Sequence, residues 1–557
     1  MRRLLPVPAV IVLAASLLAQ TSPPPGPDAR PESSCSVEGR VVSALDASPL
    51  KSAKLTLLPE HGGRKPKLRA ATTDRDGRFF FQDVMPGRYH FSALHAGFVT
   101  QSYQAKGTDD GAVLSLRPGE RVSDVLFRMT ASGVVTGRMT NEDGEPMVSA
   151  QVVALQRPSE EELEDEGASP SRKWRLQAAG SAQTDDRGQY RLFGLDPGEY
   201  YLKAVDSSEA NPNGFGNEAS WIRELIGSEY APAYYPGVAQ ATQAQVVSVK
   251  AGDEVQADFL MQRSKTVEIA GHVVGRGGPA NNAWVNLKLA GVDDYGFERQ
   301  TRTDEKGRFE LKGVPPGSYV IFVFQRDEEN GPFEPHGQQK VEVSGVNIDS
   351  IVISVGRGTS LQGRVTVDGA NSPRLERIAI DLSNVDDDEQ LGAQGRAKKD
   401  GTFEIKSVGD GNYAVTVWGL ENNWFVKSVR IGGDDILEKG LQLEKGSAGR
   451  TIEVVISSAS AQLDGSVSDD DTPVAGAHVR VVPEPETPYN RFRVHSLRTD
   501  QTGRFSFVGL APGTYRVLAR HGGAAGSGAL KSEPQVVTLS ERDHKTMQLT
   551  MVKSETE

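Results

Sequence analysis

Histidine, cysteine and glutamate are the side chains with which this chain could do hydrolytic chemistry. A zinc-dependent hydrolase needs a close His and Glu pair and a distant His around an open metal position. None of the nine histidines has a glutamate three positions later, and no two form an HExxH pair. The single cysteine, Cys35, has no catalytic setting, and His521-Gly522-Gly523 is not accompanied by a Gly-x-Ser-x-Gly motif. We therefore expect no enzyme activity, no metal and no cofactor.

A second candidate chemistry is calcium binding by an Asp-rich turn. Asp74, Asp76 and Gly77 have part of the spacing, but the further acids and the closing glutamate of a calcium loop are missing. An aspartate that accepts backbone N–H groups and a glycine with positive φ would instead close a tight turn. We assign this structural role to four pairs: Asp74 and Gly77, Asp185 and Gly188, Asp304 and Gly307, and Asp500 and Gly503.

Aromatic residues are the remaining candidates for recognition, because their flat rings can cover a sugar or a protein partner. They are concentrated between residues 211 and 237. Two interpretations stay open: the rings pack this insertion onto its own domain, or they form a ligand face. The candidate ligand residues are Trp221, Tyr230, Tyr234 and Tyr235. The same two alternatives apply to Trp418 and Trp424, whereas Trp284 lies in an alternating strand and is predicted to be structural.

The Asp-Gly turn belongs to a cassette that occurs five times. It has the form Asp-x-x-Gly-x-(Phe/Tyr) followed by Pro-Gly-x-Tyr, and the turn glycine always lies 12 positions before the tyrosine. The glycine and tyrosine pairs are Gly77 and Tyr89, Gly188 and Tyr200, Gly307 and Tyr319, Gly401 and Tyr413, and Gly503 and Tyr515. Successive turn glycines are 111, 119, 94 and 102 residues apart, which is the size of a whole domain.

The elements between these turns have the pattern of β-strands. Each cassette is preceded by a strand with Gly-x-(Val/Met) and by a second strand in which apolar and polar residues alternate, as at 473–481. The sequence therefore predicts an all-β chain of about five similar sandwich domains. We call them repeats 1 to 5 and place them at 36–130, 131–263, 266–355, 358–457 and 460–552; repeat 2 carries an acidic loop and the aromatic insertion, and repeat 4 is the most divergent.

The N-terminus is typical of an exported protein. Residues 1–20 have a basic start and a short apolar run, as in a signal peptide, and residues 21–35 form a Pro- and Ser-rich spacer that we expect to be disordered. We expect no transmembrane segment, since no stretch of about 18 apolar residues follows. With a net charge of −12 and scattered basic residues, the chain is not expected to bind nucleic acid.

The order of these motifs resembles the carboxypeptidase regulatory-like family. The resemblance is carried by Gly-x-Val, Pro-x-x-Gly-Ala-x-Val, Thr-Asp-x-x-Gly-x-Phe and Gly-Leu-x-Pro-Gly-x-Tyr, and repeat 5 matches best. Repeat 4 departs most, with Lys398 at the position of the turn aspartate and Asp410 in place of proline. The resemblance implies seven-stranded, transthyretin-like sandwiches of the carbohydrate-binding-like group. It also implies accessory modules, and no catalytic domain is attached to them here.

Two functions from different classes fit these expectations. The first is a non-catalytic binding protein that is secreted or lies in the periplasm or cell envelope. Its tandem sandwiches would each bind a polysaccharide weakly and together bind it with high avidity. The second is a structural spacer or a module that binds another envelope protein through sheet edges or loops. The resemblance makes carbohydrate the expected ligand, and the sequence names neither the sugar nor the protein partner.

The acidic run of repeat 2 gives a first test. Deletion of Glu160–Glu166 should leave folding almost unchanged, because long surface loops cost little free energy. The yield of soluble protein and the thermal unfolding of the deletion variant check this, and a loss of soluble protein would contradict it.

Overall fold

The computed structural model describes most of the chain. The described residues are 34–60, 68–105, 111–158, 176–206, 230–263, 265–275, 277–293, 299–325, 334–355, 359–369, 373–386, 392–421, 423–444, 450–522 and 530–553. Within them the structure is all-β apart from four short helical turns: α3 (Ile436–Lys439), η2 (Ala241–Gln243), η3 (Leu375–Arg377) and η4 (Arg491–Arg493). None of the described helices is long and apolar enough to cross a membrane. The predicted signal peptide and Glu160–Glu166 lie outside the described residues.

The first sheet of each repeat is built around its first strand. That strand pairs antiparallel with the strand that follows the Asp-Gly turn and parallel with the last strand of the repeat. The sheets are β4 (Arg78–Val84), β1 (Cys35–Ser43) and β8 (Arg121–Met129); β12 (Gln189–Leu195), β9 (Gly133–Asn141), β16 (Glu254–Gln256) and β17 (Phe259–Met261); β23 (Arg308–Val314), β18 (Val267–Gly275), β26 (Ile348–Ser354) and β19 (Gly278–Pro279); β30 (Thr402–Val408), β27 (Thr359–Asp368), β35 (Thr451–Ser457), β32 (Phe425–Ile431) and β33 (Asp434–Asp435); and β40 (Arg504–Leu510), β36 (Ala461–Asp469), β44 (His544–Lys553) and β37 (Thr472–Pro473).

The second sheet of each repeat is antiparallel, and in repeat 5 its strand β42 (Leu530–Ser532) also pairs with β44, which joins the two sheets of that repeat into one. The central pair of each second sheet is formed by the second strand of the repeat and the strand that begins at Pro-Gly-x-Tyr. The sheets are β3 (Arg69–Thr72), β2 (Lys54–Pro59), β5 (Gly87–Leu94), β6 (Gln101–Ser102) and β7 (Leu114–Leu116); β11 (Leu176–Gln183), β10 (Gln151–Gln156), β13 (Gly198–Val205), β14 (Ala233–Tyr234) and β15 (Val247–Val249); β22 (Arg299–Arg302), β20 (Trp284–Leu289), β24 (Gly317–Gln325) and β25 (Glu334–Val343); β29 (Ala393–Arg396), β28 (Ala379–Asn384), β31 (Gly411–Trp418) and β34 (Leu441–Leu443); and β39 (His495–Arg498), β38 (His478–Pro483), β41 (Gly513–His521), β42 (Leu530–Ser532) and β43 (Gln535–Leu539).

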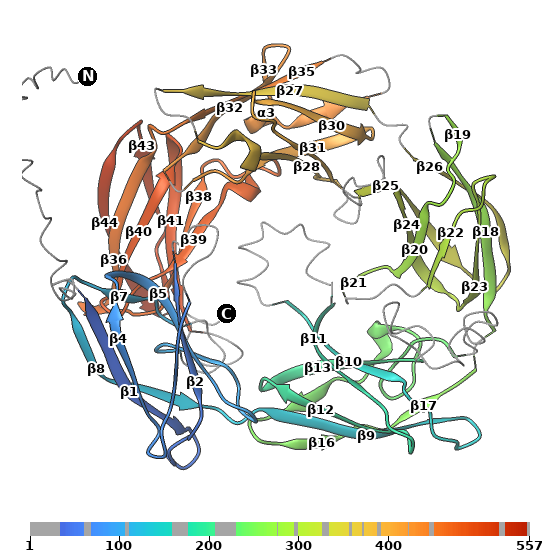
Figure 1. Ribbon diagram of the computed structural model, residues 1–557, viewed down its shortest axis with the longest axis horizontal. Helices are drawn as coiled ribbons and strands as arrows, with labels where there is room; N and C mark the ends of the chain where they lie inside the picture. Colours follow the sequence, from blue (N-terminus) through green and yellow to red (C-terminus); the bar gives the residue numbers. More distant parts are fainter. Residues whose placement is uncertain are drawn as a thin grey trace, which may run out of the picture.

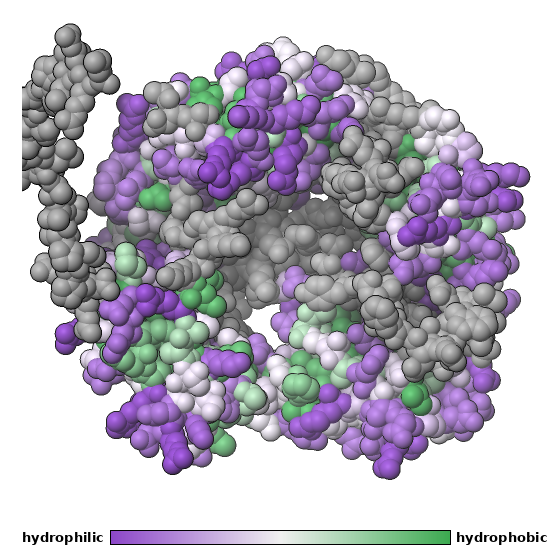
Figure 2. Space-filling view, viewed as in Figure 1, coloured by the Kyte–Doolittle hydropathy of each residue, from purple (hydrophilic) through white to green (hydrophobic). Residues whose placement is uncertain are grey.

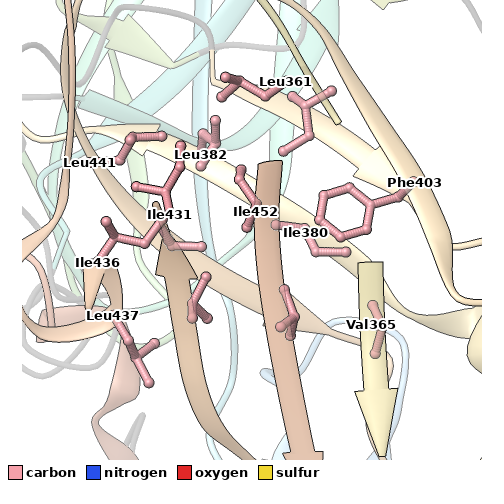
Figure 3. Packing of buried hydrophobic residues seen from close by; sticks show 14 of the residues in the cluster. Leu361, Val365, Ile380, Leu382, Phe403, Ile431, Ile436, Leu437, Leu441 and Ile452 are labelled. Atoms are coloured by element: carbon pink, nitrogen blue, oxygen red, sulfur yellow. The ribbon is translucent and has the colours of Figure 1, made fainter. Parts of the chain in front are cut away.

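Each pair of sheets encloses its own apolar core. Five large clusters of buried side chains lie among the described residues, one in each repeat, and Figure 3 shows the cluster of repeat 4. In that repeat Ile380 and Leu382 of β28 point toward Leu361 and Val365 of β27. Alternate residues of each strand supply these cores, because successive side chains point to opposite faces of a sheet. The fold is therefore all-β and consistent with tandem sandwiches.

The repeated glycine of the first strand is required by close packing. A Cβ on Gly465 would collide with the ring of Phe505 and with the carbonyl oxygen of Met547 in the parallel last strand. Gly465 and Phe505 are direct cross-strand partners, so the aromatic ring covers the glycine. Gly39, Gly137, Gly271 and Gly363 are enclosed by their last strands in the same way.

The Asp-Gly turn is closed by side-chain and backbone hydrogen bonds. In repeat 5, Oδ1 of Asp500 accepts from the backbone N–H groups of Thr502 and Arg504 at 2.9 and 3.0 Å. The carbonyl of Gly503 accepts from the first strand, at Val467, over 2.8 Å. In repeat 4 Lys398 takes the aspartate position, and its backbone retains the turn bond to Gly401.

The threonine before the turn aspartate joins the turn to the rest of the repeat. Its buried hydroxyl donates to a carbonyl of the segment before the second strand and accepts the N–H of an alanine there. For Thr499 these partners are Val474, at 2.7 Å, and Ala477, at 2.9 Å. Thr73, Thr184 and Thr303 make the same two bonds. The hydrogen bonds of the turn therefore connect three parts of the repeat: the first strand, the start of the second strand and the strand that follows the turn.

The tyrosine of Pro-Gly-x-Tyr is anchored at both ends. Its ring lies in the core, and its hydroxyl donates to the carbonyl four residues earlier, as expected for a tyrosine corner. The five bonds are Tyr89 to Met85 at 2.7 Å, Tyr200 to Asp196 at 2.7 Å, Tyr319 to Pro315 at 3.1 Å, Tyr413 to Gly409 at 3.1 Å and Tyr515 to Ala511 at 2.8 Å.

The repeats follow one another around a central opening (Figure 1). In each repeat the first sheet lies on the outer side and the second sheet lies toward the opening, as β27 and β28 of repeat 4 illustrate. Consequently the polar faces of the second sheets, opposite the cores, are turned toward one shared space. The space-filling view shows hydrophilic residues over much of the outer rim of this arrangement (Figure 2).

The turn glycines give a stability prediction. Gly307 has φ 73°, and an added Cβ would lie 2.5 Å from the carbonyl oxygen of Val273. We expect Gly307→Ala to destabilise repeat 3 by about 1 to 3 kcal/mol. Gly345 of the same repeat also has positive φ, at 91°, but open space around it, so Gly345→Ala is the matched control. Calorimetric unfolding of the full chain measures both; equal shifts for the two variants would show that the contact with Val273 is unimportant.

The corner tyrosines give a pH prediction. Burial, followed by the charge of Asp196, raises the pKa of Tyr200 to about 12 from the ordinary value of 10.0. The pKa of Tyr200 is higher in the folded chain than in the unfolded chain. The contribution of this tyrosine to the free energy of unfolding is therefore complete below pH 10 and is lost as the pH rises toward about 12. Burial also raises the pKa values of Tyr89, Tyr413 and Tyr515. Phenolate absorbance of these tyrosines should therefore rise together with the loss of the β circular dichroism signal, not before it.

Candidate functional site

The aromatic insertion is described only in part. Trp221 lies outside the described residues. Tyr234 is only 1% exposed and packs in a small cluster with Val153, Leu155 and Leu176 on the second sheet of repeat 2. Tyr235 contacts the ring of Phe259 with centroids 5.7 Å apart. Tyr234 and Tyr235 thus pack against apolar side chains, and a ligand role for either stays a prediction.

Tyr230 is half-buried at the edge of the same core. It packs against the core of repeat 2, and the Nδ2 of Asn141 donates to its hydroxyl over 3.4 Å. Tyr230 therefore lies between the core and the surface of repeat 2. A ligand role for Tyr230 stays a prediction.

The turn aspartates and the cysteine have structural surroundings. Asp74, Asp185 and Asp304 each accept two backbone N–H groups through Oδ1, as Asp500 does. Cys35 is buried at the start of β1, where its thiol donates to the carbonyl of Arg117 over 2.9 Å. In the part of the chain that the structure describes, no three His, Cys, Asp or Glu side chains are placed to hold a metal ion.

One row of positions carries different chemistry in each repeat. It crosses the second sheet on the face opposite the core and consists of three directly paired residues, which we call the inner row. The inner rows of repeats 1 to 5 are Thr72, Lys54 and Leu94; Gln183, Gln151 and Val205; Arg302, Trp284 and Phe324; Arg396, Ala379 and Trp418; and Arg498, His478 and Arg520. Cross-strand partners have Cβ atoms about 5 Å apart, so each triplet forms one continuous surface.

In repeat 3 the inner row combines aromatic rings with an arginine. The Cζ of Arg302 lies 3.9 Å from the ring centroid of Trp284, so the guanidinium stacks on the indole. Nη1 of Arg302 also donates to Asn282 at 2.9 Å, which holds the stack in place. Phe324 completes the row on the other side of Trp284.

Amide side chains lie in the next row of the same face. Asn286 pairs with Gln300 on one side and with Phe322 on the other, and Phe322 pairs with Gln338. Asn286 is 4% exposed, and its buried Oδ1 accepts no hydrogen bond from the residues that the structure describes. Repeat 3 therefore places aromatic rings beside a buried amide side chain.

In repeat 4 the inner row presents an exposed indole. Trp418 is 56% exposed at the end of β31, and its neighbour across the strands is the small Ala379, with Arg396 beyond. The next row places Asp381 between Gln394 and Thr416. Burial raises the pKa of Asp381, and the hydroxyl of Ser383 donates to its Oδ2 over 2.8 Å. Trp424, by contrast, is buried in the core of this repeat.

The inner row of repeat 5 is basic. Arg498 and Arg520 flank His478, and Arg480 lies two residues further along β38 on the same face. His478 and Arg480 are buried. This face therefore differs in charge from the inner rows of repeats 3 and 4.

The side chains on these faces are of types that occur in recognition surfaces. An aromatic ring can cover the apolar face of a sugar, while amide, carboxylate and guanidinium groups bond its hydroxyls. Trp284 was predicted to be structural, and the inner row in which it lies was not predicted. The signal was present, because the row lies two residues before the turn aspartate position and five residues after the corner tyrosine, as in Arg302 and Phe324.

Comparison with known proteins follows the sequence motifs. A model of the carboxypeptidase regulatory-like domain matches residues 36–119 and 462–552. Colossin-A of Dictyostelium discoideum is 21% identical over 397 residues, which is 64% of this chain and 3% of Colossin-A. The chain thus spans a very small part of this curated relative.

Three solved structures are similar to parts of this chain. The Bacillus anthracis TIE protein is 12% identical, with 72% of this chain and 68% of that chain covered and a TM-score of 0.15. GBS52, the minor pilin of Streptococcus agalactiae, is 15% identical, with 41% and 96% covered and a TM-score of 0.22. BcpA, the major pilin subunit of Bacillus cereus, is 13% identical, with 57% and 99% covered and a TM-score of 0.13. At such TM-scores we draw no conclusion from these likenesses.

At both ends of the chain, the sequence motifs and the paired sheets coincide with the match to the family model. Residues 36–119 and 462–552 are carboxypeptidase regulatory-like domains.

Proposed function

We propose that this chain is an exported, non-catalytic binding protein of five tandem sandwiches, and that its ligand is a polysaccharide bound on the inner faces of repeats 3 and 4. The observation that carries this proposal is the face around Trp284, where the guanidinium of Arg302 stacks on the indole and Phe324 lies on the other side. The exposed Trp418 occupies the inner row of the adjacent repeat.

A polymer suits this arrangement better than a small molecule. Each face offers only a few polar groups and one or two rings, so a single site would be weak. A polysaccharide can engage the faces of two repeats at once, which raises the overall affinity without further contacts. The repeats are joined in one chain, and their inner faces are turned toward the same opening (Figure 1).

Location outside the cytoplasm belongs to the same proposal. It rests on the signal-peptide pattern of residues 1–20 and on the expected spacer at 21–35. A secreted, periplasmic or envelope-attached protein would meet extracellular polysaccharide directly.

A glycan array with the full mature chain tests the proposal. Trp418→Ala should weaken binding about tenfold, equivalent to about 1.4 kcal/mol, because the exposed ring loses its stacking contact. Trp284→Ala should weaken binding and release Arg302.

The matched control is Phe193→Ala. Phe193 is an equally accessible aromatic residue, 74% exposed, but it lies on the first sheet of repeat 2 and so on the outer side. Binding lost equally in Phe193→Ala and Trp418→Ala would contradict a site on the inner faces. Binding removed by a Tyr230→Ala and Tyr235→Ala variant alone would place the site on the aromatic insertion.

The alternative function is a structural spacer or a module that binds another envelope protein. The contacts between neighbouring repeats favour it: β21 (Val292–Asp293) of repeat 3 pairs with β11 of repeat 2, and Arg493 of repeat 5 bonds Glu438 of repeat 4. Such contacts hold distances fixed, as a spacer requires. An array without any bound glycan, together with purification of one protein partner, would replace the carbohydrate proposal with this one.

A further inference from the structure

The Asp-Gly turn of repeat 5 has a different environment from its counterparts. Asp500 is 5% exposed and Gln501 is half-buried, whereas Asp74 and Asp185 are exposed to solvent. The cause is repeat 1, which lies beside repeat 5 although about 390 residues separate them in the chain (Figure 1). A turn that is a surface feature in repeats 1 and 2 is therefore an interface in repeat 5.

Gln501 makes the most specific contact of this interface. Its Oε1 accepts the backbone N–H of Ser115 over 2.9 Å, and its Nε2 donates to the carbonyl of the same residue over 2.7 Å. The N–H of Val113 donates to the carbonyl of Thr499 over 3.3 Å. A side-chain amide thus pairs with the free edge of β7 as a neighbouring strand would.

A second set of contacts surrounds this pair. Arg88 bonds Glu60 within repeat 1, donates to the carbonyl of Arg498 over 3.3 Å and lies 3.9 Å from the carboxylate of Asp500. Ala475 packs against the core cluster of repeat 1. A Cβ on Gly476 would lie 3.1 Å from the backbone of Gly111, so the two chains approach closely there.

The identity of residue 501 distinguishes repeat 5 from the others. The same turn position holds Arg75, Asp186, Glu305 and Lys399 in repeats 1 to 4. A charged lysine or arginine can only donate, and an ionised carboxylate can only accept, whereas an amide does both. Of the five turns, only that of repeat 5 can bond both backbone groups of a strand edge.

We propose that repeats 1 and 5 form an intramolecular latch, centred on Gln501 and Ser115, which closes the chain into a ring. Its partner surface is the free edge of β7 together with Arg88. Because the two halves belong to one chain, their effective concentration favours closure within a molecule over pairing between molecules. Closure also covers an edge strand that would otherwise be open to aggregation.

Small-angle X-ray scattering of the full chain tests the latch. The native protein should show a compact radius of gyration that does not change with concentration. Gln501→Glu, which removes the donor and adds a negative charge, should open the ring and increase the radius. Glu305→Gln, at the same turn position of repeat 3, is the matched control and should leave the radius unchanged.

Ser115→Pro tests the latch from repeat 1, because proline lacks the backbone N–H that residue 115 donates to Gln501. The N–H of Ser115 points to Gln501, and proline is tolerated at such an edge position. Circular dichroism of each variant should retain the native β signal. An unchanged radius in both folded variants would overturn the proposal, and so would a native radius that grows with concentration, because the contact would then join separate molecules.

Discussion

The hydrogen bond between the turn glycine and the first strand is the interaction on which each repeat depends. The carbonyl of the glycine accepts from the strand N–H over 2.8 Å in all five repeats, with donors Val41, Met139, Val273, Val365 and Val467. Positive φ at the glycine and the aspartate cap make that approach attainable. The bond brings the turn strand beside the first strand, and this pairing places the turn aromatic over the strand glycine and the corner tyrosine in the core. In repeats 1, 2, 3 and 5 the second sheet is then held by the same turn through its threonine.

This scaffold separates stability from recognition. The cassette residues face the cores or close turns, so they are nearly constant from repeat to repeat. The inner-row residues face away from the cores and vary from Lys54 in repeat 1 to Trp284 in repeat 3 and His478 in repeat 5. One backbone plan can therefore present aromatic, amide or basic surfaces. If repeats 1 and 5 close the ring, these surfaces share one space, and a ligand must be thin enough to enter it.

Much of the fold could be predicted from the sequence, because its signals are local. The spacing of Gly307 and Tyr319 predicts a turn and a corner, and both have the expected geometry. The inner row was not predicted, although its positions have a fixed spacing from the turn and the corner, because Arg302, Trp284 and Phe324 become neighbours only through strand register. The contact between Gln501 and Ser115 was equally inaccessible, because nothing in either segment indicates a partner about 390 residues away. For Tyr234, the aromatic residues nearby in the sequence suggested a ligand face. In the structure its ring packs against Leu155 instead of lying on the surface.

The central claim is that the inner faces of the second sheets, rather than the outer sheets or the turns, bind the ligand. Hydrogen exchange of the full chain, followed by mass spectrometry with and without a bound polysaccharide, tests it most directly. We predict slower exchange in β22 and β25 of repeat 3 and in β29 and β31 of repeat 4, with β12 and β23 of the first sheets unchanged. Protection confined to the first sheets, or to the aromatic insertion of repeat 2, would contradict the claim.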